Sequence, residues 1–246
     1  MKRAILLLAT ATLGMTGCYS RRDPGTMTFY WNFRSSQGAV AGDLSVANPG
    51  CDVAGVDQVE VLIDNGRFTS TCVGSNGVPG VQLQQFLPGA YPFQVNGLRQ
   101  GEVVFTVSGT ANADYNVDSQ VPVTLDAVPT QSFVLFYNVN GFTPTQCVFN
   151  GRGVAGIVYW LEDSLGRLVS TTQVAGTSAQ QPVACDPLSF GISVPNLPVG
   201  AYFLRYFQAI DGAGATIVQT CGTGVSHTGF PAIINLHDPA VTDVCT

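Results

Sequence analysis

Hydrophobic and polar residues alternate along most of the chain with a period of two residues, which is typical of β-strands. Val59, Val61 and Ile63 form one such series, and Val121 and Val123 begin another. Apolar residues do not recur at the three- and four-residue spacing of an amphipathic helix. Twenty-eight glycines and fourteen prolines punctuate the alternating runs, as turn residues do. The pattern predicts an all-β protein made of short strands.

The same order of features occurs twice. Each copy has an aromatic-rich strand, then a cysteine followed four residues later by glycine, then an apolar strand, and then a Gly-Arg turn. With a two-residue insertion in the second turn, residues 56–63 align with 154–161 and residues 66–67 align with 166–167. Such internal repetition carries more weight than local propensity. We therefore expect two tandem β-sandwich domains of immunoglobulin-like size, covering residues 27–126 and 131–246.

A short motif adds a resemblance to known sandwich domains. Residues 197–202, Leu-Pro-Val-Gly-Ala-Tyr, resemble the Leu-Pro-x-Gly-x-Tyr turn of prealbumin-like and carboxypeptidase-regulatory-like domains, and residues 87–91 match it with one residue deleted. The resemblance implies a β-sandwich. It also implies carbohydrate partners, protein partners or a purely structural spacing role. Residues 126–130, between the copies, are too few for independent tumbling, so we expect a fixed or semi-rigid tandem.

The first residues have the composition of a secretory signal. Lys2 and Arg3 precede an apolar run and small residues up to Gly17, in the order that export signals show. About fourteen uncharged residues precede Cys18, whereas a transmembrane helix requires roughly twenty. We therefore expect residues 1–17 to be a signal peptide.

Residues 13–18, Leu-Gly-Met-Thr-Gly-Cys, resemble the bacterial lipobox. The resemblance implies that Cys18 receives a diacylglycerol thioether, becomes the new N-terminus and carries fatty acyl chains, two or more of which anchor a protein stably. Met15 stands where the lipobox usually has leucine, which leaves an ordinary signal peptide as the alternative. Tyr19 replaces the aspartate that favours inner-membrane retention in enterobacterial lipoproteins. We expect a cell-envelope protein, lipid-anchored at the outer membrane through a tether of residues 18–26.

The lipobox also explains the odd number of cysteines. The chain has seven, and acylation of one leaves six. Because the protein is exported to an oxidising compartment, we expect these six to form disulfides. Six cysteines allow fifteen connectivities, but the repeat aligns the cysteines of the two copies. We predict three bridges: Cys51–Cys72, Cys147–Cys185 and Cys221–Cys245.

The charge balance argues against nucleic acid as a partner. Without the signal peptide the chain has eight arginines, no lysine and sixteen acidic residues, a net charge near −8. An acidic surface repels a phosphate backbone. At 46% hydrophobic and 11% charged residues, the composition is that of a folded protein.

Two motifs that suggest enzymes have the wrong context. Residues 151–156 fit the letters of the dinucleotide fingerprint, but they precede a strand and no helix follows them. Ser226 and His227 are adjacent, but they lack the strand-turn-helix of a nucleophile elbow. We interpret both segments as structural loops, with Ser226 and His227 in an exposed polar one, and predict that the protein is not an enzyme.

Two groups of residues resemble metal sites but depart from the known patterns. Cys221, His227, His237 and Cys245 match no common zinc spacing, and a Cys221–Cys245 disulfide with two surface histidines is the favoured interpretation. Asp114, Asn116 and Asp118 alternate as calcium ligands do, but the glycine and glutamate of an EF-hand are missing. We predict no cofactor; a calcium site with another loop geometry is the alternative.

One strand carries aromatic residues on both of its faces. Strict alternation places Tyr202, Leu204 and Tyr206 on one face and Phe203, Arg205 and Phe207 on the other. One face belongs to the core. The other, together with Trp160, is a candidate binding face, because exposed rings with an arginine are typical of interaction surfaces; the alternative is that these rings fill the cores and the contact between copies.

These observations favour a non-catalytic surface lipoprotein that acts as an adhesion, scaffold or envelope-interaction module. The alternative function is a carbohydrate-binding lipoprotein that uses the aromatic face of Trp160, Phe203, Arg205 and Phe207. Expected partners are the membrane, through the lipid anchor, and an envelope protein or polysaccharide.

Overall fold

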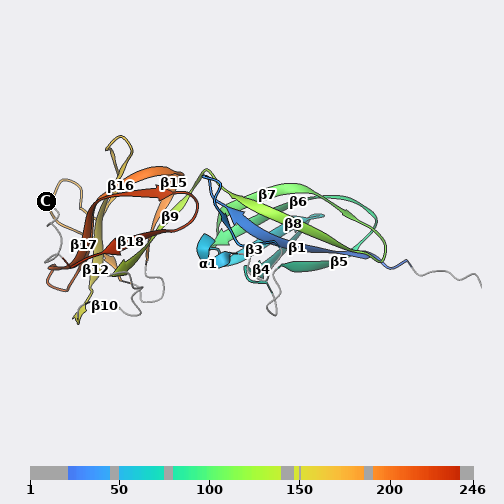
Figure 1. Cartoon of the computed structure of the whole chain (residues 1–246), viewed down its shortest axis with the longest axis horizontal. Helices are drawn as coiled ribbons and strands as arrows, with labels where there is room; N and C mark the ends of the chain where they lie inside the picture. The colour runs from blue at the N-terminus through green and yellow to red at the C-terminus, as the bar shows by residue number, and fades with distance from the viewer. Residues whose placement is uncertain are drawn as a thin grey trace, which may run out of the picture.

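The computed structural model describes residues 22–44, 50–74, 80–139, 147–149, 151–185 and 191–238, and nearly all its regular structure is β-strand. Figure 1 shows two β-sandwiches, here called module 1 and module 2, arranged end to end along the long axis. The all-β prediction is confirmed. No described helix is long and apolar enough to cross a membrane.

Module 1 contains one turn of helix, α1 (Cys51–Ala54), and the strands β1 (Gly25–Arg34), β2 (Val40–Ala41), β3 (Gln58–Ile63), β4 (Gly66–Thr71), β5 (Val81–Phe86), β6 (Gly89–Arg99), β7 (Glu102–Ala113) and β8 (Asp118–Ala127). Module 2 contains β9 (Thr130–Val139), β10 (Val148–Phe149), β11 (Arg152–Gly153), β12 (Gly156–Asp163), β13 (Leu168–Thr171), β14 (Val183–Ala184), β15 (Gly191–Pro198), β16 (Gly200–Ile210), β17 (Thr216–His227) and β18 (Ala232–Leu236).

The two modules share one strand plan. In module 1, β1 pairs in parallel with β8 and antiparallel with β5, and the opposite layer has the order β4-β3-β6-β7; a short antiparallel pairing of β7 with β8 joins the two layers into one sheet. In module 2, β9 pairs in parallel with β18 and antiparallel with β15, and the opposite layer has the order β13-β12-β16-β17. The sequence repeat therefore corresponds to a repeat of topology.

Each module has its own hydrophobic core between its two layers. The largest side chains of the first core include Phe29, Trp31 and Phe105, all fully buried, and those of the second include Phe133 and Leu161. Burial of this kind is the dominant stabilising contribution to a sandwich. In each module, the inward-facing residues of the alternating strands thus hold the two layers together.

The Leu-Pro-x-Gly-x-Tyr segments form equivalent turns. The Tyr202 hydroxyl donates to the carbonyl of Pro198 at 2.7 Å, and the Tyr91 hydroxyl donates to the carbonyl of Leu87 at 3.0 Å. In both cases the tyrosine closes a connection by bonding four residues back, a device similar to the tyrosine corner of immunoglobulin-like domains. The motif is therefore structural in both modules.

Two of the predicted disulfides are present. Cys51 is bonded to Cys72 and Cys147 to Cys185, and each bridge attaches the segment before β3 or β12 to the segment after the following hairpin. Cys221 is also disulfide-bonded. The predicted partner Cys245 and the lipidation residue Cys18 lie outside the described residues, so these two assignments stay predictions.

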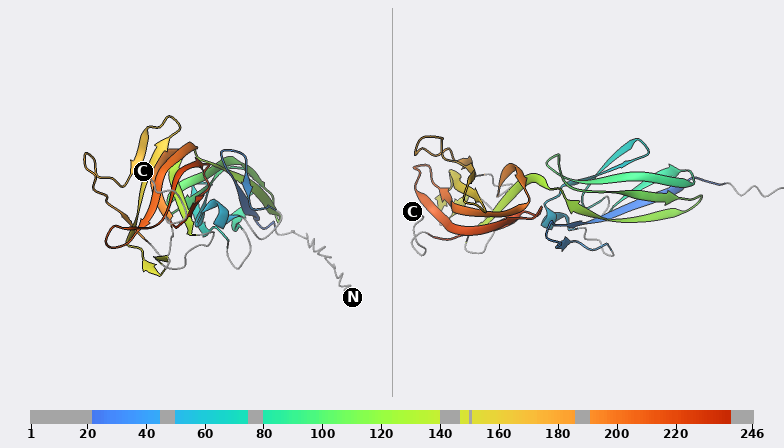
Figure 2. Two further views of the ribbon diagram at one scale, coloured as in Figure 1. Left: turned by 60° about the vertical axis from the view of Figure 1, so that its left-hand side comes forward. Right: turned by 90° about the horizontal axis from the view of Figure 1, so that it is seen from above.

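The connection between the modules is shorter than the sequence suggested. β8 ends at Ala127 and β9 begins at Thr130, so only Val128 and Pro129 separate the last strand of one sandwich from the first of the next. β1 begins at Gly25, two residues before the expected start of the first domain. Figure 2 shows that this continuous path places the sandwiches in line.

Candidate functional site

The predicted aromatic face is only partly correct, because a β-bulge interrupts the alternation of β16. Trp160 lies opposite Tyr206, but Leu161 lies opposite Leu204, so β16 holds one extra residue at Arg205. Beyond the bulge Phe207 points inward and is 0% exposed, whereas Phe203 is 40% exposed. The assignment of Phe207 to a binding face was therefore wrong, and Phe207 belongs to the core of module 2.

The Trp160 side chain lies on the outer face of its sheet and is contacted by residues of β16 and by Glu162 of its own strand. The Arg205 guanidinium lies 5.9 Å from the centroid of the indole ring, a cation–π arrangement. The indole N–H donates to Glu162 Oε1 at 2.7 Å. The ring of Tyr206 lies 6.4 Å away, and its hydroxyl accepts from Gln180 Nε2 at 3.0 Å. Three of the four predicted residues, Trp160, Phe203 and Arg205, thus occur on one outer face.

A groove lies on the other side of Trp160, towards β13. It has a volume of about 630 Å³ and is lined by Trp160, Leu168, Thr171, Gln173, Val174, Ala175, Gly176, Thr177 and Ser178. None of these lining residues carries a charge. Sequence reasoning missed the groove, because residues 172–180 have no alternation and no motif that distinguishes them from an ordinary loop.

A second candidate region is the joint between the modules, where one arginine connects them. Arg99, at the end of β6, is only 9% exposed. Its Nε and Nη2 donate to the carbonyls of Gly55 and Ala54 in module 1 at 3.0 and 2.7 Å. Its Nη1 donates to Ser132 and its Nη2 to Gly229, both in module 2, at 3.1 and 2.9 Å. Burial lowers the pKa of Arg99 to about 10, so it remains a cation at neutral pH.

The loop between β17 and β18 completes the joint. Phe230 lies in this loop of module 2 but packs against the core of module 1, 5.7 Å from the ring of Phe105. Gly229 has φ 95°, and a Cβ there would come within 2.5 Å of the Cβ of Ala127. The close approach of the two chain segments therefore requires glycine. Neither Arg99 nor Phe230 stands out in the sequence, since their partners are far away along the chain.

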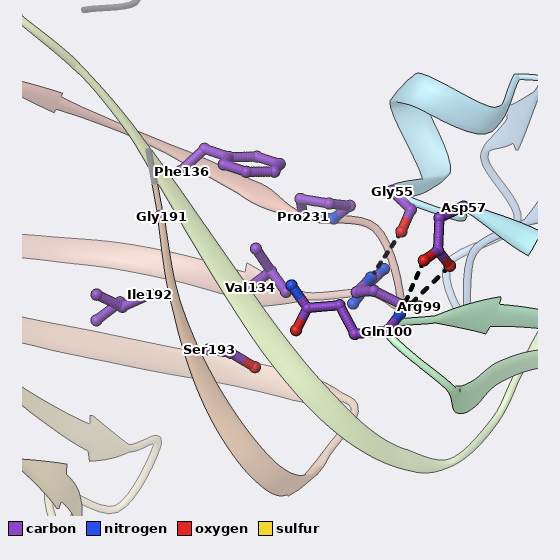
Figure 3. Close-up of a pocket in the computed structure, with 10 residues that line it drawn as sticks. All are labelled: Gly55, Asp57, Arg99, Gln100, Val134, Phe136, Gly191, Ile192, Ser193 and Pro231. Atoms are coloured by element: carbon purple, nitrogen blue, oxygen red, sulfur yellow. Dashed lines mark hydrogen bonds between the residues drawn. The ribbon is translucent and has the colours of Figure 1, made fainter. Parts of the chain in front are cut away.

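The joint borders a cleft of about 430 Å³ (Figure 3). Val134, Phe136, Ile192 and Pro231 form its apolar part, and Asp57 accepts from the backbone N–H of Gln100 at its edge. An arginine beside a cleft often indicates an anion site. Here four of the guanidinium's five N–H groups already bond to carbonyls, so no pair of donors remains for two-pronged binding of an anion. Arg99 is a structural residue.

His227 lies next to the joint and is buried, which contradicts the prediction of an exposed loop and a surface histidine. It is 1% exposed and stacks on Phe133 with ring centroids 4.5 Å apart. Among the described residues, neither ring nitrogen has a partner in full hydrogen-bond geometry, although backbone groups of Gln131 and Leu197 lie close enough to act against the lowering of its pKa. Burial is the main cause that lowers the pKa of His227, and the positive charge of Arg99 acts in the same direction. The ring therefore serves as a packing element, although the adjacent Ser226 is exposed.

The other motifs have structural surroundings in the described part of the chain. Residues 152–153 form β11 and β12 begins at Gly156, so the glycine-rich segment leads into a strand. The Asp118 carboxylate accepts from the hydroxyls of Thr26 and Thr28 at 2.8 and 2.9 Å. Among the described residues, no group of three or more His, Cys, Asp or Glu side chains is placed to hold a metal ion.

Comparisons with known proteins report only distant likeness. No family model and no curated protein match the chain. Solved structures with similar folds include the Bacillus anthracis TIE protein, with 9% identity, a TM-score of 0.27, and coverage of 88% of this chain and 34% of that one. The chain thus spans about a third of that protein's length.

The match extends over nearly the full length of two pilins. The minor pilin GBS52 of Streptococcus agalactiae has 13% identity and a TM-score of 0.26, covering 90% of this chain and 99% of that one. The shaft pilin spaA of Lactobacillus rhamnosus GG has 10% identity and a TM-score of 0.29, covering 88% and 97%. These scores are low, and no functional inference for this chain rests on them.

Proposed function

We propose that the chain is a non-catalytic lipoprotein of the cell envelope, in which Cys18 carries the lipid anchor and the two modules form a fixed spacer. In this proposal module 1 lies next to the membrane, and module 2 is presented to an adhesion or scaffold partner. The membrane is the outer one, as Tyr19 after the lipobox cysteine favours.

The joint is the observation that supports this function most strongly. Two unrestrained sandwiches would need no buried arginine between them and no aromatic side chain shared between their cores. Arg99 bonds to carbonyls of both modules, Phe230 of module 2 packs on the core of module 1, and Glu102 Oε1 accepts from the Ser132 N–H at 2.8 Å. Such contacts hold neighbouring domains in one orientation. A fixed orientation is useful to a spacer.

Figure 1 shows that the first described residues, before β1, lie at the end of module 1 away from module 2. A chain anchored just before these residues would extend module 2 outwards from the bilayer. The short tether, which ends where β1 begins at Gly25, would keep module 1 close to the lipid surface.

The anchor and the spacer are tested separately. Metabolic labelling with an alkyne fatty acid, followed by membrane fractionation, should label the full-length protein in the outer membrane, and Cys18→Ala should abolish both label and membrane retention. Label that persists in Cys18→Ala would contradict the anchor. For the spacer, spin labels at exposed Leu165 and Leu87 should give one narrow distance distribution. A broad distribution in the wild-type protein would contradict a fixed tandem.

A further inference from the structure

We propose that the groove beside Trp160 is a binding site for an uncharged polysaccharide, with one sugar ring stacked on the indole. This inference goes beyond the spacer function and does not depend on the lipid anchor. It also differs from the aromatic face predicted from the sequence, because the site lies towards β13 and not along β16.

The first support is the position of Trp160 on its sheet. In the order β13-β12-β16, Trp160 stands on the central strand, with Thr171 opposite it on one side and Tyr206 opposite it on the other. Arg205 and Tyr206 occupy the β16 side, and Glu162 fixes the indole N–H. The ring is therefore held in place, and it also lines the groove. A fixed aromatic ring is a platform for the apolar C–H face of a sugar.

The second support is that the wall of the groove is already ordered by its own hydrogen bonds. Gln173 Nε2 donates to the carbonyl of Thr177 at 2.7 Å, and Val174 N donates to the carbonyl of Ala179 at 2.9 Å. The Thr172 hydroxyl donates to Gln180 Oε1 at 2.8 Å. A preformed loop loses little conformational entropy on binding.

The third support is the chemistry of the lining. Gln173 Oε1 and the Ser178 hydroxyl have no hydrogen bond to any described residue, which leaves an acceptor and a donor for sugar hydroxyls. The lining contains no carboxylate, arginine or lysine, and the acidic chain as a whole disfavours an anionic polymer. A volume of about 630 Å³ is in the range of small-ligand pockets. An uncharged chain of hexose units meets these conditions.

Calorimetric titration of the soluble protein starting at Arg21 tests the site. The neutral probes are cellohexaose, maltohexaose and mannohexaose, and the acidic probe is hexa-galacturonate. We expect at least one neutral probe to bind and the acidic probe to bind more weakly. Trp31 is buried, so a change in tryptophan emission on binding reports on Trp160.

Two variants and one control assign the binding to the groove. Trp160→Leu should weaken binding by about tenfold or more, the size of one lost stacking contact. Ser178→Asp places a charge in the groove without touching the indole and should weaken binding as well. Phe203→Leu is the matched control, since Phe203 is exposed on the same sheet but does not line the groove, and its affinity should equal that of the wild type.

Three results would overturn the proposal. They are the failure of all three neutral probes to bind, unchanged affinity in Trp160→Leu, and binding of hexa-galacturonate as tight as that of the best neutral probe. A failed anchor experiment would leave these measurements unaffected, because they use the soluble protein.

Discussion

Strand β3 of module 1 and strand β12 of module 2 occupy the same place in the plan but carry different outer faces. At the position where β12 has Trp160 opposite Tyr206, β3 has Leu62 opposite Gln94. Beside it, Glu60 of β3 lies opposite Asn96, whose amide donates to Glu60 Oε2 at 3.1 Å. Module 1 thus has a polar, internally hydrogen-bonded face where module 2 has an aromatic one.

The β-bulge in β16 is a second difference between the outer faces of the two modules. β3 and β6 pair without interruption from Gln58 to Ile63, whereas β12 and β16 shift register at Arg205. One extra residue reverses the direction of every side chain beyond it, and here it brings Tyr206 to the outside and Phe207 to the inside. The inward-facing residues thus preserve the strand arrangement that the two modules share, while the outward-facing residues differ between them.

The largest expected effect comes from the disulfides and tests whether the modules depend equally on them. Removing Cys51–Cys72 or Cys147–Cys185 by double alanine replacement should cost about 3 to 4 kcal/mol in the free energy of unfolding. The second bridge should cost slightly more, because it spans 38 residues and the first spans 21. Urea denaturation of the oxidised variants measures both values, and the reverse order would contradict a loop-entropy origin.

The next effect concerns the joint, which couples the modules. Arg99→Met leaves buried carbonyls of Ala54, Ser132 and Gly229 without their donor, and we expect a loss of about 3 kcal/mol. The modules should then unfold in separate steps, followed by circular dichroism and tryptophan emission. Arg34→Met is the control, since Arg34 pairs with Asp126 at the surface and its loss should change stability far less. Equal effects of the two variants would show that Arg99 does not hold the joint.

Phe230→Ala tests whether module 2 supports the core of module 1. Phe230 is partly buried against that core, so its loss should cost about 2 kcal/mol, less than the roughly 3 to 5 kcal/mol of a fully buried phenylalanine. The cost should appear in the unfolding of module 1, although the substituted residue lies in module 2. Phe203→Ala, at an exposed site in module 2, is the control and should cost less. A loss confined to module 2 would contradict the shared packing.

The smallest effect is a pH dependence from His227. Its folded pKa lies below the ordinary value of 6.5, so the unfolded chain takes up a proton first as the pH falls. Stability contributed by the neutral ring is complete above pH 6.5 and decreases as the pH falls from there towards the folded pKa. Arg99 and Glu102 are the nearby charges, with opposite influence.

His227→Phe keeps a stacking ring but cannot be protonated, so the decrease in unfolding free energy between pH 8 and pH 5 should become smaller. The aspartates with lowered pKa values, Asp126, Asp163 and Asp211, affect stability only at more acidic pH. An unchanged decrease in His227→Phe would exclude this histidine as the cause.

The sequence alone was sufficient for the all-β class, the repeat and two disulfide pairings. Each of these depends on features that are local or that recur in register: the two-residue alternation of Val59 and Val61, the Gly-Arg turns, and the equivalent cysteines. The Gly-Arg pair of module 1 follows a tight turn in which Asp64 and Asn65 adopt positive φ angles of 50° and 60°, as such a turn requires.

The tertiary structure alone decided which aromatic rings face outwards, where the groove lies and how the joint is built. Strict alternation placed Phe207 outside, and only the pairing of β16 with β12 reveals the extra residue that turns it inward. Arg99 and Phe230 become important through partners far along the chain, which include Gly229 and Phe105. Local pattern specifies which side chains avoid water, but it does not specify which distant backbone they meet, since that depends on how the two sandwiches pack together.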